Sequence, residues 1–315
     1  MIAASAHPFD WHLHLFWVLA IPAVLALYVW ATWRRDDHDG AHDQVQATGR
    51  QRALFVLGMV VLAGAVTWPL ADLAVHWLLM ALVLQRLLLT LAVPPLLVLG
   101  TPRPLLVRLT RPAAVDAVLR VAVRPIPAVI IVTVVAVGTL TTGAVDLAAR
   151  SDAARVAIEI VVLASGFVLW APVLTELPGA PRLSPLARGG YLIVQSIVPS
   201  FLSIVWIFAR HSLYPAYSHP GKVVDLSPLL DQQLAGFLAK LSTIAVLWSV
   251  AFVIMTRASA SDLAGREEPL LWSDVEREIE RADRQERRHG VPGPFGSGTG
   301  RGSSRGGGPD PSDSP

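Results

Sequence analysis

The chain has 315 residues, of which 53% are hydrophobic and 16% are charged, and its mean hydropathy is +0.51. Soluble domains carry about 25% charged residues, so this composition indicates an integral membrane protein. The formal charge of +2 gives no reason to expect a nucleic-acid partner, and the absence of cysteine excludes disulfides, thiolate metal sites and thiol redox chemistry.

The chain opens with MIAASAHPFDWHLH, and the first apolar run after this segment ends in WRRDD. The opening segment has no basic region and the run has no small-residue cleavage site, so the sequence predicts no cleavable signal peptide. The run is predicted to remain in the protein as its first membrane span, with residues 1–12 on the extracytoplasmic side.

Seven segments reach or approach the roughly 20 apolar residues that a helix needs to cross a bilayer. The second of them is short, and the fourth is interrupted by Thr and Gly. Since a backbone in lipid must satisfy its own hydrogen bonds, they predict an all-α bundle of seven transmembrane helices over residues 13–255. The segments are Leu13–Trp33, Ala53–Trp68, Val75–Leu99, Ile126–Val145, Ala153–Val173, Tyr191–Ala209 and Leu234–Met255.

Arginine gathers in alternate connections between these predicted spans. The connections after the first, third and fifth spans and the C-terminal tail are basic, whereas the other connections carry few basic residues. The positive-inside rule therefore places the N-terminus outside and the C-terminus in the cytoplasm. The expected location is a bacterial inner membrane, which the chain crosses several times.

Local motifs predict where some of the later helices begin. RLSPLAR before the sixth span and DLSPLLDQQ before the seventh each offer Ser as an N-cap and Pro in the first turn. Residues 256–289 form a predicted cytoplasmic tail with a short charged helix, which begins at a capping box of Ser273 and Glu276. Residues 290–315 are rich in Gly, Ser and Pro and are predicted to be disordered.

Most of the nine histidines fall outside the bundle or near the outer end of a span. Imidazole suits copper and zinc, and carboxylates can orient it through its second nitrogen. Asp72 and His76 are four residues apart and could pair on one helical face. A structural layer of hydrogen bonds is the alternative interpretation of these polar residues. The candidate metal ligands on this side are His12, His14, His76 and His211.

Three charged residues fall inside predicted spans: Arg86, Glu159 and Lys240. Arg86 lies about eleven residues into the third span, roughly 16 Å deep at 1.5 Å per residue. An isolated charge at the bilayer centre costs about 2.5–3.5 kcal/mol even on the lenient insertion scale. We therefore expect a buried polar network in which Glu159 neutralises Arg86, Lys240 or both, with Gln85 and Gln195 adding hydrogen bonds. A structural ion pair and a proton or ion path both remain open.

Several longer motifs carry a resemblance to a known family. LQRLLLTLAVPPLLVLG, RLSPLARGGYLIVQSIVPSFLSIVWIFARHSLYPAY and DQQLAG occur in this order, after RALFVLGMVVLAGAVTWPLADLA. This collinear set resembles the CtaG-type cytochrome c oxidase assembly factors over about residues 10–255. The resemblance implies a seven-span protein that assists maturation of a haem–copper oxidase through extracytoplasmic copper handling. The residues that match these motifs include Asp72, Tyr214, Tyr217, Asp231, Gln232 and Gln233.

The chain departs from the family where metal ligands are expected. At the two His positions of the family's H-x-x-Q-H pattern this chain has Leu82 and Arg86, and it retains the Gln as Gln85. Its H-x-x-E-H pattern meets Val156 and Ile160, with Glu159 retained. Apolar side chains cannot ligate, and a guanidinium repels a cation. We therefore expect no family-type copper site at these positions and interpret Arg86 as a fixed cation in place of a metal.

Taken together, the sequence and the resemblance predict a non-enzymatic membrane chaperone of the respiratory chain. Its expected partners are cytochrome c oxidase subunits or other assembly factors, together with membrane lipid. The alternative is a small transporter or ion-conducting protein using Arg86, Glu159 and Lys240. No G-x-S-x-G, paired-Asp or H-E-x-x-H signature supports a third interpretation as an intramembrane hydrolase.

Overall fold

The computed structural model describes residues 14–33, 47–122, 124–174, 183–217, 226–266, 279–281 and 284, and every regular element in these ranges is helical. The elements in chain order are α1 (Leu15–Trp33), α2 (Gly49–Val66), α3 (Leu70–His76), α4 (Leu79–Leu87), the π-helical η1 (Leu88–Ala92), α5 (Val93–Gly100), α6 (Arg103–Thr110), α7 (Ala113–Ala122), α8 (Pro125–Thr139), α9 (Thr142–Arg150), α10 (Asp152–Trp170), α11 (Pro185–Ile207), the 3-10 turn η2 (Pro215–Tyr217) and α12 (Pro228–Arg266).

Six helical segments of the described chain are long and apolar enough to cross a membrane. They are Leu15–Thr32, Gly49–His76, Leu79–Gly100, Asp152–Trp170, Pro185–Ile207 and Pro228–Ala260. A seventh is reached only if residues 115–121 and α8, which are bent by 103° at their junction, count as one span. The prediction of an all-helical protein with several membrane spans is therefore confirmed, and the described residues contain six candidate spans, or up to seven.

The predicted fourth span, Ile126–Val145, is wrong as a continuous helix. α8 ends at Thr139 and α9 begins at Thr142, where the Thr141 hydroxyl accepts a hydrogen bond from the Ala144 N–H. This N-cap starts a new helix, which breaks the apolar run in two. The 15 residues of α8 extend about 22 Å, short of the roughly 30 Å hydrocarbon core.

The boundary between the second and third predicted spans also moves. The predicted third span begins at Val75, but Val75 belongs to α3, which continues the second span beyond Trp68. Leu78 is extended, and the next helix begins at Leu79. The start of α4 is set by a carboxylate from α12, described below, which a reading of local hydropathy cannot anticipate.

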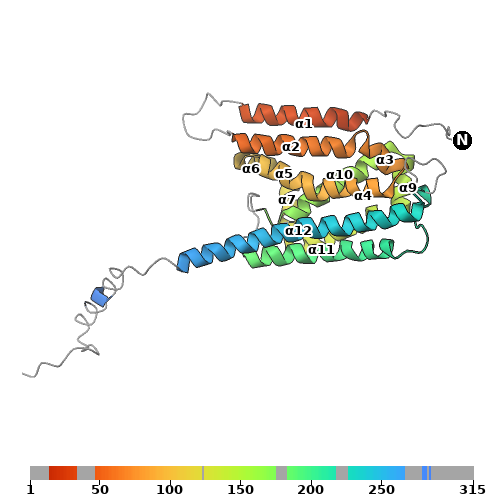
Figure 1. The fold of residues 1–315 in the computed structure, drawn as a ribbon. Coiled ribbons are helices and arrows are strands. Elements are labelled where there is room, and N and C mark those ends of the chain that lie inside the picture. The colour runs from red at the N-terminus through yellow and green to blue at the C-terminus, as the bar shows by residue number, and fades with distance from the viewer. Residues whose placement is uncertain are drawn as a thin grey trace, which may run out of the picture. The chain divides into compact units, whose positions relative to one another are not determined.

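The helices of the compact unit Met1–Ala258 pack side by side. In Figure 1, α1 and α2 run along one side of this unit, α11 and α12 run along the other, and α4, α5 and α10 lie between them. The short helices α3 and α9 lie at one end, where α4, α10 and α12 begin, and α6 lies at the opposite end. We call these the α9 end and the α6 end.

Close packing near the α6 end joins α1, α2 and α5. The rings of Tyr28 and Phe55 stack 3.7 Å apart, and the Tyr28 hydroxyl donates to the Gly100 carbonyl at 2.9 Å. A Cβ at Gly100 would lie 2.5 Å from the Phe55 nitrogen, so only glycine allows this approach. Small residues at helix contacts are expected in membranes, where association depends on close packing rather than on exclusion of water.

The sequence VPP explains the π-helical turn η1. Pro94 has no N–H and therefore cannot bond to the Thr90 carbonyl one turn earlier. The indole Nε1 of Trp170 donates to that carbonyl instead, at 3.0 Å. Such widened turns often accompany prolines inside helices. This bond joins η1 to the last turn of α10, beside Gly166, which packs against the same turn.

The structure confirms both predicted Ser-Pro helix starts. The Ser184 hydroxyl accepts from the Ala187 N–H and the Ser227 hydroxyl from the Leu230 N–H, each at 3.2 Å. α12 continues past residue 255 to Arg266. In the second compact unit, Ser259–Pro315, the predicted capping box and the segment 290–315 lie outside the described residues.

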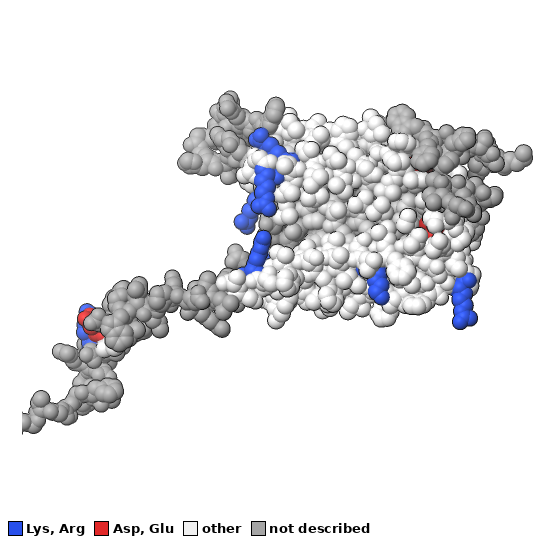
Figure 2. Space-filling model, viewed as in Figure 1, with Lys and Arg blue, Asp and Glu red and all other residues white. Residues whose placement is uncertain are grey.

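Charge is unevenly distributed over the surface of the first unit. Figure 2 shows Lys and Arg gathered where α2 begins and α6 lies, while most of the visible surface between the two ends carries no charge. Arg50 and Arg52 are at the start of α2, and Arg103 and Arg108 are on α6. Many large apolar side chains of the helices are exposed, among them Phe252 at 69%, as expected of a surface that faces lipid.

Candidate functional site

A polar layer near the α9 end begins with Trp17 in the first turn of α1. Its Nε1 donates to Glu159 Oε2 of α10 at 2.6 Å. Trp17 is 5% exposed and Glu159 is 1% exposed, so this bond lies inside the bundle. An indole N–H is a donor only, and it satisfies one oxygen of the carboxylate without adding charge.

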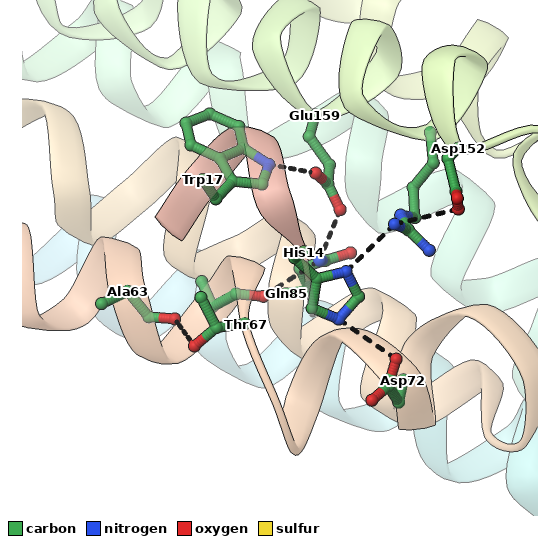
Figure 3. A network of polar contacts seen from close by, with 10 residues as sticks. His14, Trp17, Ala63, Thr67, Asp72, Gln85, Asp152 and Glu159 are labelled. Carbon is green, nitrogen blue, oxygen red and sulfur yellow. Dashed lines mark hydrogen bonds and ion pairs between the residues drawn. The ribbon is translucent and has the colours of Figure 1, made fainter. Parts of the chain in front are cut away.

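The second oxygen of this carboxylate is bound from α4. Gln85 Nε2 donates to Glu159 Oε1 at 3.0 Å and also to the Ala65 carbonyl of α2 at 2.9 Å. Glu159 is therefore held by α1 and α4, and Gln85 extends the connection to α2 (Figure 3). A buried carboxylate is tolerated when its oxygens accept such bonds.

His14, three residues before Trp17, makes a parallel set of contacts (Figure 3). Its Nδ1 is 3.0 Å from Arg155 Nη2, and Arg155 is also paired with Asp152 at 3.1 Å. Its Nε2 lies 3.1 Å from Asp72 Oδ1, an ion-pair distance outside hydrogen-bond geometry. A guanidinium only donates, so Nδ1 is the acceptor and the proton of a neutral ring is on Nε2, facing Asp72.

The expected contact between Arg86 and Glu159 does not form. Arg86 is 9% exposed and lies inside the bundle, but no ion pair within the described part of the chain joins it to Glu159. Both Glu159 oxygens are taken by Trp17 and Gln85, which carry no charge. Lys240 is partly buried on α12, and it too is absent from the ion pairs between described residues.

The DQQ motif at the start of α12 binds other elements at the α9 end. Asp231 accepts from the backbone N–H groups of Leu79, at 2.6 Å, and Met80, at 3.1 Å. These are the first N–H groups of α4, which have no partner within their own helix, so Asp231 caps a helix other than its own. A carboxylate is also favoured electrostatically at a helix N-terminus.

The two glutamines of the motif bind the connection between α11 and α12. Gln232 Oε1 accepts from the Leu213 N–H at 2.7 Å, and Gln233 Nε2 lies 3.5 Å from the Ala209 carbonyl, at the limit of a hydrogen bond. Gln232 is 1% exposed. The side chains of this motif thus hold backbone groups that lie outside regular helical hydrogen bonding.

The two tyrosines of LYPAY bind the neighbouring short elements. Tyr214 donates to the Leu140 carbonyl before α9, and Tyr217 donates to the Ala74 carbonyl of α3, both at 2.6 Å. Burial raises the pKa of Tyr214 to about 12 and raises that of Tyr217 further, because a phenolate would lose its hydration there. Both hydroxyls are therefore protonated donors at neutral pH.

The predicted metal ligands do not come together in the described structure. His14 is in the polar layer, whereas His76 on α3 and His211 after α11 are exposed. His12 lies outside the described residues. No group of three or more His, Cys, Asp or Glu side chains that could share a metal ion occurs in the part of the chain that the structure describes.

The three apolar residues at the family's histidine positions lie in different surroundings. Leu82 is 5% exposed and packs in the core, while Ile160 is 42% exposed on the outside of α10. Val156 is intermediate. The three side chains are apolar, and they offer no ligand atom to a metal ion.

Sequence reasoning missed two members of the polar layer, Trp17 and Arg155. A signal for both was present, because Trp17 is three residues after His14 and Arg155 is four residues before Glu159. Both spacings place side chains on one helical face.

These observations define an all-helical, multi-span membrane protein whose polar residues join its helices at one end. A sequence model of the family described as cytochrome c oxidase caa3 assembly factor matches residues 26–261. The chain belongs to this family, as the resemblance predicted. Neither the search of curated proteins nor that of solved structures gave a match.

Proposed function

We propose that this chain assists cytochrome c oxidase assembly as a non-enzymatic scaffold, acting through its α9 end. Membership of the assembly-factor family supports the role in assembly. One structural observation supports the scaffold: the motif residues Asp231, Gln232, Tyr214 and Tyr217 all bind backbone groups of neighbouring elements. Such contacts give a surface of defined shape, which a docking oxidase subunit or another assembly factor requires.

We further propose that the α9 end faces the extracytoplasmic side of a bacterial inner membrane and that the bent α7–α8 pair crosses it. The concentration of arginine around α2 and α6 supports this orientation through the positive-inside rule. The N-terminus would then be outside and the C-terminus cytoplasmic, with seven spans in all.

Copper handling remains part of the proposal only at the surface of the α9 end. Exposed His76 and His211 are the described residues best suited to pass copper to a partner, together with His12. His14 is less suited, because Arg155 occupies its Nδ1. A site of the family type at Leu82, Arg86, Val156 and Ile160 is not proposed.

Deletion of the gene, with complementation, tests the role in assembly. We expect the deletion to lower oxidase activity and the haem content of isolated membranes, and the wild-type gene to restore both. Asp231→Ala should restore them poorly because α4 loses its cap, whereas Ser227→Ala, which removes an exposed cap of α12 itself, should restore them well. Normal oxidase in the deletion strain would exclude this function.

Measuring copper in the same membranes separates the scaffold from copper handling. If copper is delivered through the surface histidines, the His76→Ala/His211→Ala double variant should lower the copper content, and added copper should restore activity. If the protein acts as a scaffold alone, that variant should complement fully. The transporter alternative, which has Arg86 beside an internal cavity in its favour, predicts normal oxidase together with an altered ion or solute flux.

A further inference from the structure

A cavity of about 100 Å³ lies inside the bundle, between α4, η1, α8, α10, α11 and α12. Arg86 and Gln195 contribute polar side chains to its wall, while Leu87, Leu91, Leu202 and Leu247 are among its apolar residues. A cavity of this size has room for several water-sized groups. Trp17, Gln85 and Glu159 of the polar layer do not line this cavity.

The guanidinium of Arg86 reaches this cavity with hydrogen-bonding capacity left over. Its Nε and Nη1 are buried and have no acceptor among the described residues. The side chain is more than nine-tenths buried, and Glu159 is already bound by two neutral donors. Each of these two nitrogens keeps an N–H that an anion can accept from, and a guanidinium binds the two oxygens of a carboxylate when either Nε or Nη1 donates together with Nη2.

Gln195 adds a second polar group whose Oε1 is likewise without a partner in the described structure. It is 2% exposed on α11, one turn before Pro199. Rotation of its amide by half a turn exchanges oxygen and nitrogen and presents an N–H₂ donor to the cavity. Arg86 and Gln195 can then donate to the same anionic group.

On the α8 side, the cavity wall lies next to a surface that would face lipid. Val137, which contributes to its wall, is 43% exposed, and Ile130 and Val134 on the same helix are 57% and 64% exposed. Arg86 is about 10 Å along the axis from the start of α4 at Leu79. A ligand that entered beside Val137 from the bilayer would bring its polar head to the guanidinium inside the bundle, below this end of the helices.

We propose that this cavity binds the carboxylate head of a fatty-acid-like amphiphile, with Arg86 as the anion-binding residue and the leucine walls holding the first part of the chain. An inorganic anion would have to exchange its hydration for mostly apolar walls, which is unfavourable. An alkyl carboxylate presents methylene groups to these walls and its charge to Arg86. This proposal does not depend on the role in oxidase assembly.

Quenching of tryptophan fluorescence tests the proposal in detergent-purified full-length protein. Trp206 lines the cavity and is 2% exposed, so a decanoate brominated near its carboxylate should quench it saturably. The matching brominated decanol, which lacks the charge, should give only weak, non-saturating quenching. In Trp206→Phe the saturable part should disappear, while decanoate still raises the melting temperature.

Variants at Arg86 decide the outcome. Arg86→Leu removes a buried charge without an ion-pair partner and should fold, and its affinity for the brominated decanoate should fall at least tenfold. Arg86→Lys keeps the charge but loses the paired N–H groups, and its affinity should fall less. Equal affinity in the wild type and both variants would overturn the proposal. If chloride alone, at constant ionic strength, protects Trp206 from quenching by the brominated decanoate, the site binds a halide ion. That result would also overturn the proposal.

Discussion

Glu159 is kept in an apolar bundle by two neutral donors rather than by a cation. Trp17 and Gln85 each bind one oxygen, and they belong to different helices. The contacts thus join α1, α4 and α10 through a single side chain. A guanidinium in the same place would add its own desolvation cost, which often offsets the gain from a buried ion pair.

Replacing Glu159 by Gln is expected to destabilise the protein by about 1–3 kcal/mol. The amide has one oxygen and one N–H₂ group, so a donor would face either the Trp17 indole or the Gln85 amide. Asp152→Asn is the matched control, because that carboxylate is 88% exposed and should contribute little. Unfolding in mixed micelles measures the difference, and equal stability of the two variants would contradict the assigned network.

The predicted ion pair between Arg86 and Glu159 is wrong because of how the helices are rotated. An arginine in the third predicted span and a glutamate in the fifth suggested an ion pair, since opposite charges attract strongly at low dielectric. Which side chains meet depends on the rotation of each helix about its axis. Here Trp17 and Gln85 donate to the two oxygens of the Glu159 carboxylate. Arg86 is left facing the cavity instead.

At the scale of elements, η1 shows how a helix irregularity becomes a packing surface. The Thr90 carbonyl, to which Pro94 has no N–H to donate, accepts from the Trp170 indole. Gly166 of α10 lies against the same turn. A Cβ at Gly166 would lie 2.7 Å from Pro94 Cγ and 2.8 Å from the Leu89 carbonyl oxygen. Backbone oxygen cannot move aside as a flexible side chain can.

Gly166→Ala should therefore destabilise the protein by about 1–3 kcal/mol, as overpacking in a core does. Gly64→Ala in α2 is the control, because a Cβ there meets nothing within 4 Å, and removal of a helical glycine should leave stability unchanged or slightly increased. Thermal unfolding of the two variants in detergent compares them. Similar melting temperatures would show that α10 and η1 are less closely packed than described.

Asp231 of α12 caps the start of another helix, α4. Asp231→Ala should expose the Leu79 and Met80 amides to hydrogen exchange, because both lose their acceptor. The start of α12, capped by Ser227, should keep its protection. Exchange followed by mass spectrometry resolves the two helices. Faster exchange at α12 alone would mean that Asp231 caps its own helix.

For the whole molecule, the decisive question is whether the bent α7–α8 pair crosses the membrane. The chain contains no cysteine, so single cysteine variants can be labelled without background. Leu109 on α6 and Leu147 on α9 are both 54% exposed, and among the described residues the α7–α8 pair is the one candidate crossing between them. They form a matched pair of positions.

In intact cells, we expect a membrane-impermeant maleimide to label Leu147→Cys and not Leu109→Cys until the membrane is permeabilised. This result would establish seven spans with the α9 end outside. Labelling of both positions from the same side would mean that α7 and α8 form a re-entrant element and that the chain has six spans. The reverse pattern would invert the proposed orientation.

The family and the helical membrane class were readable from the sequence because they depend on local quantities. Apolar length, the Ser-Pro helix starts and the collinear motifs need no knowledge of which helices touch. Six of the seven predicted spans each correspond to one candidate span of the described residues, with boundaries shifted by up to eight residues. The motif ending in DQQ was also recognisable, although the helix that its aspartate caps was not.

Tertiary structure alone decided the break at Leu140 and Thr141, the start of α4, and the partners of Glu159 and Arg86. Each depends on contacts between residues far apart in the chain or on competition between a cap and a continuing helix. Asp231 lies 152 residues from the Leu79 amide that it binds, and Trp17 lies 142 residues from Glu159. Hydropathy is a sum over neighbours in sequence, whereas these bonds are fixed by the positions and rotations of whole helices.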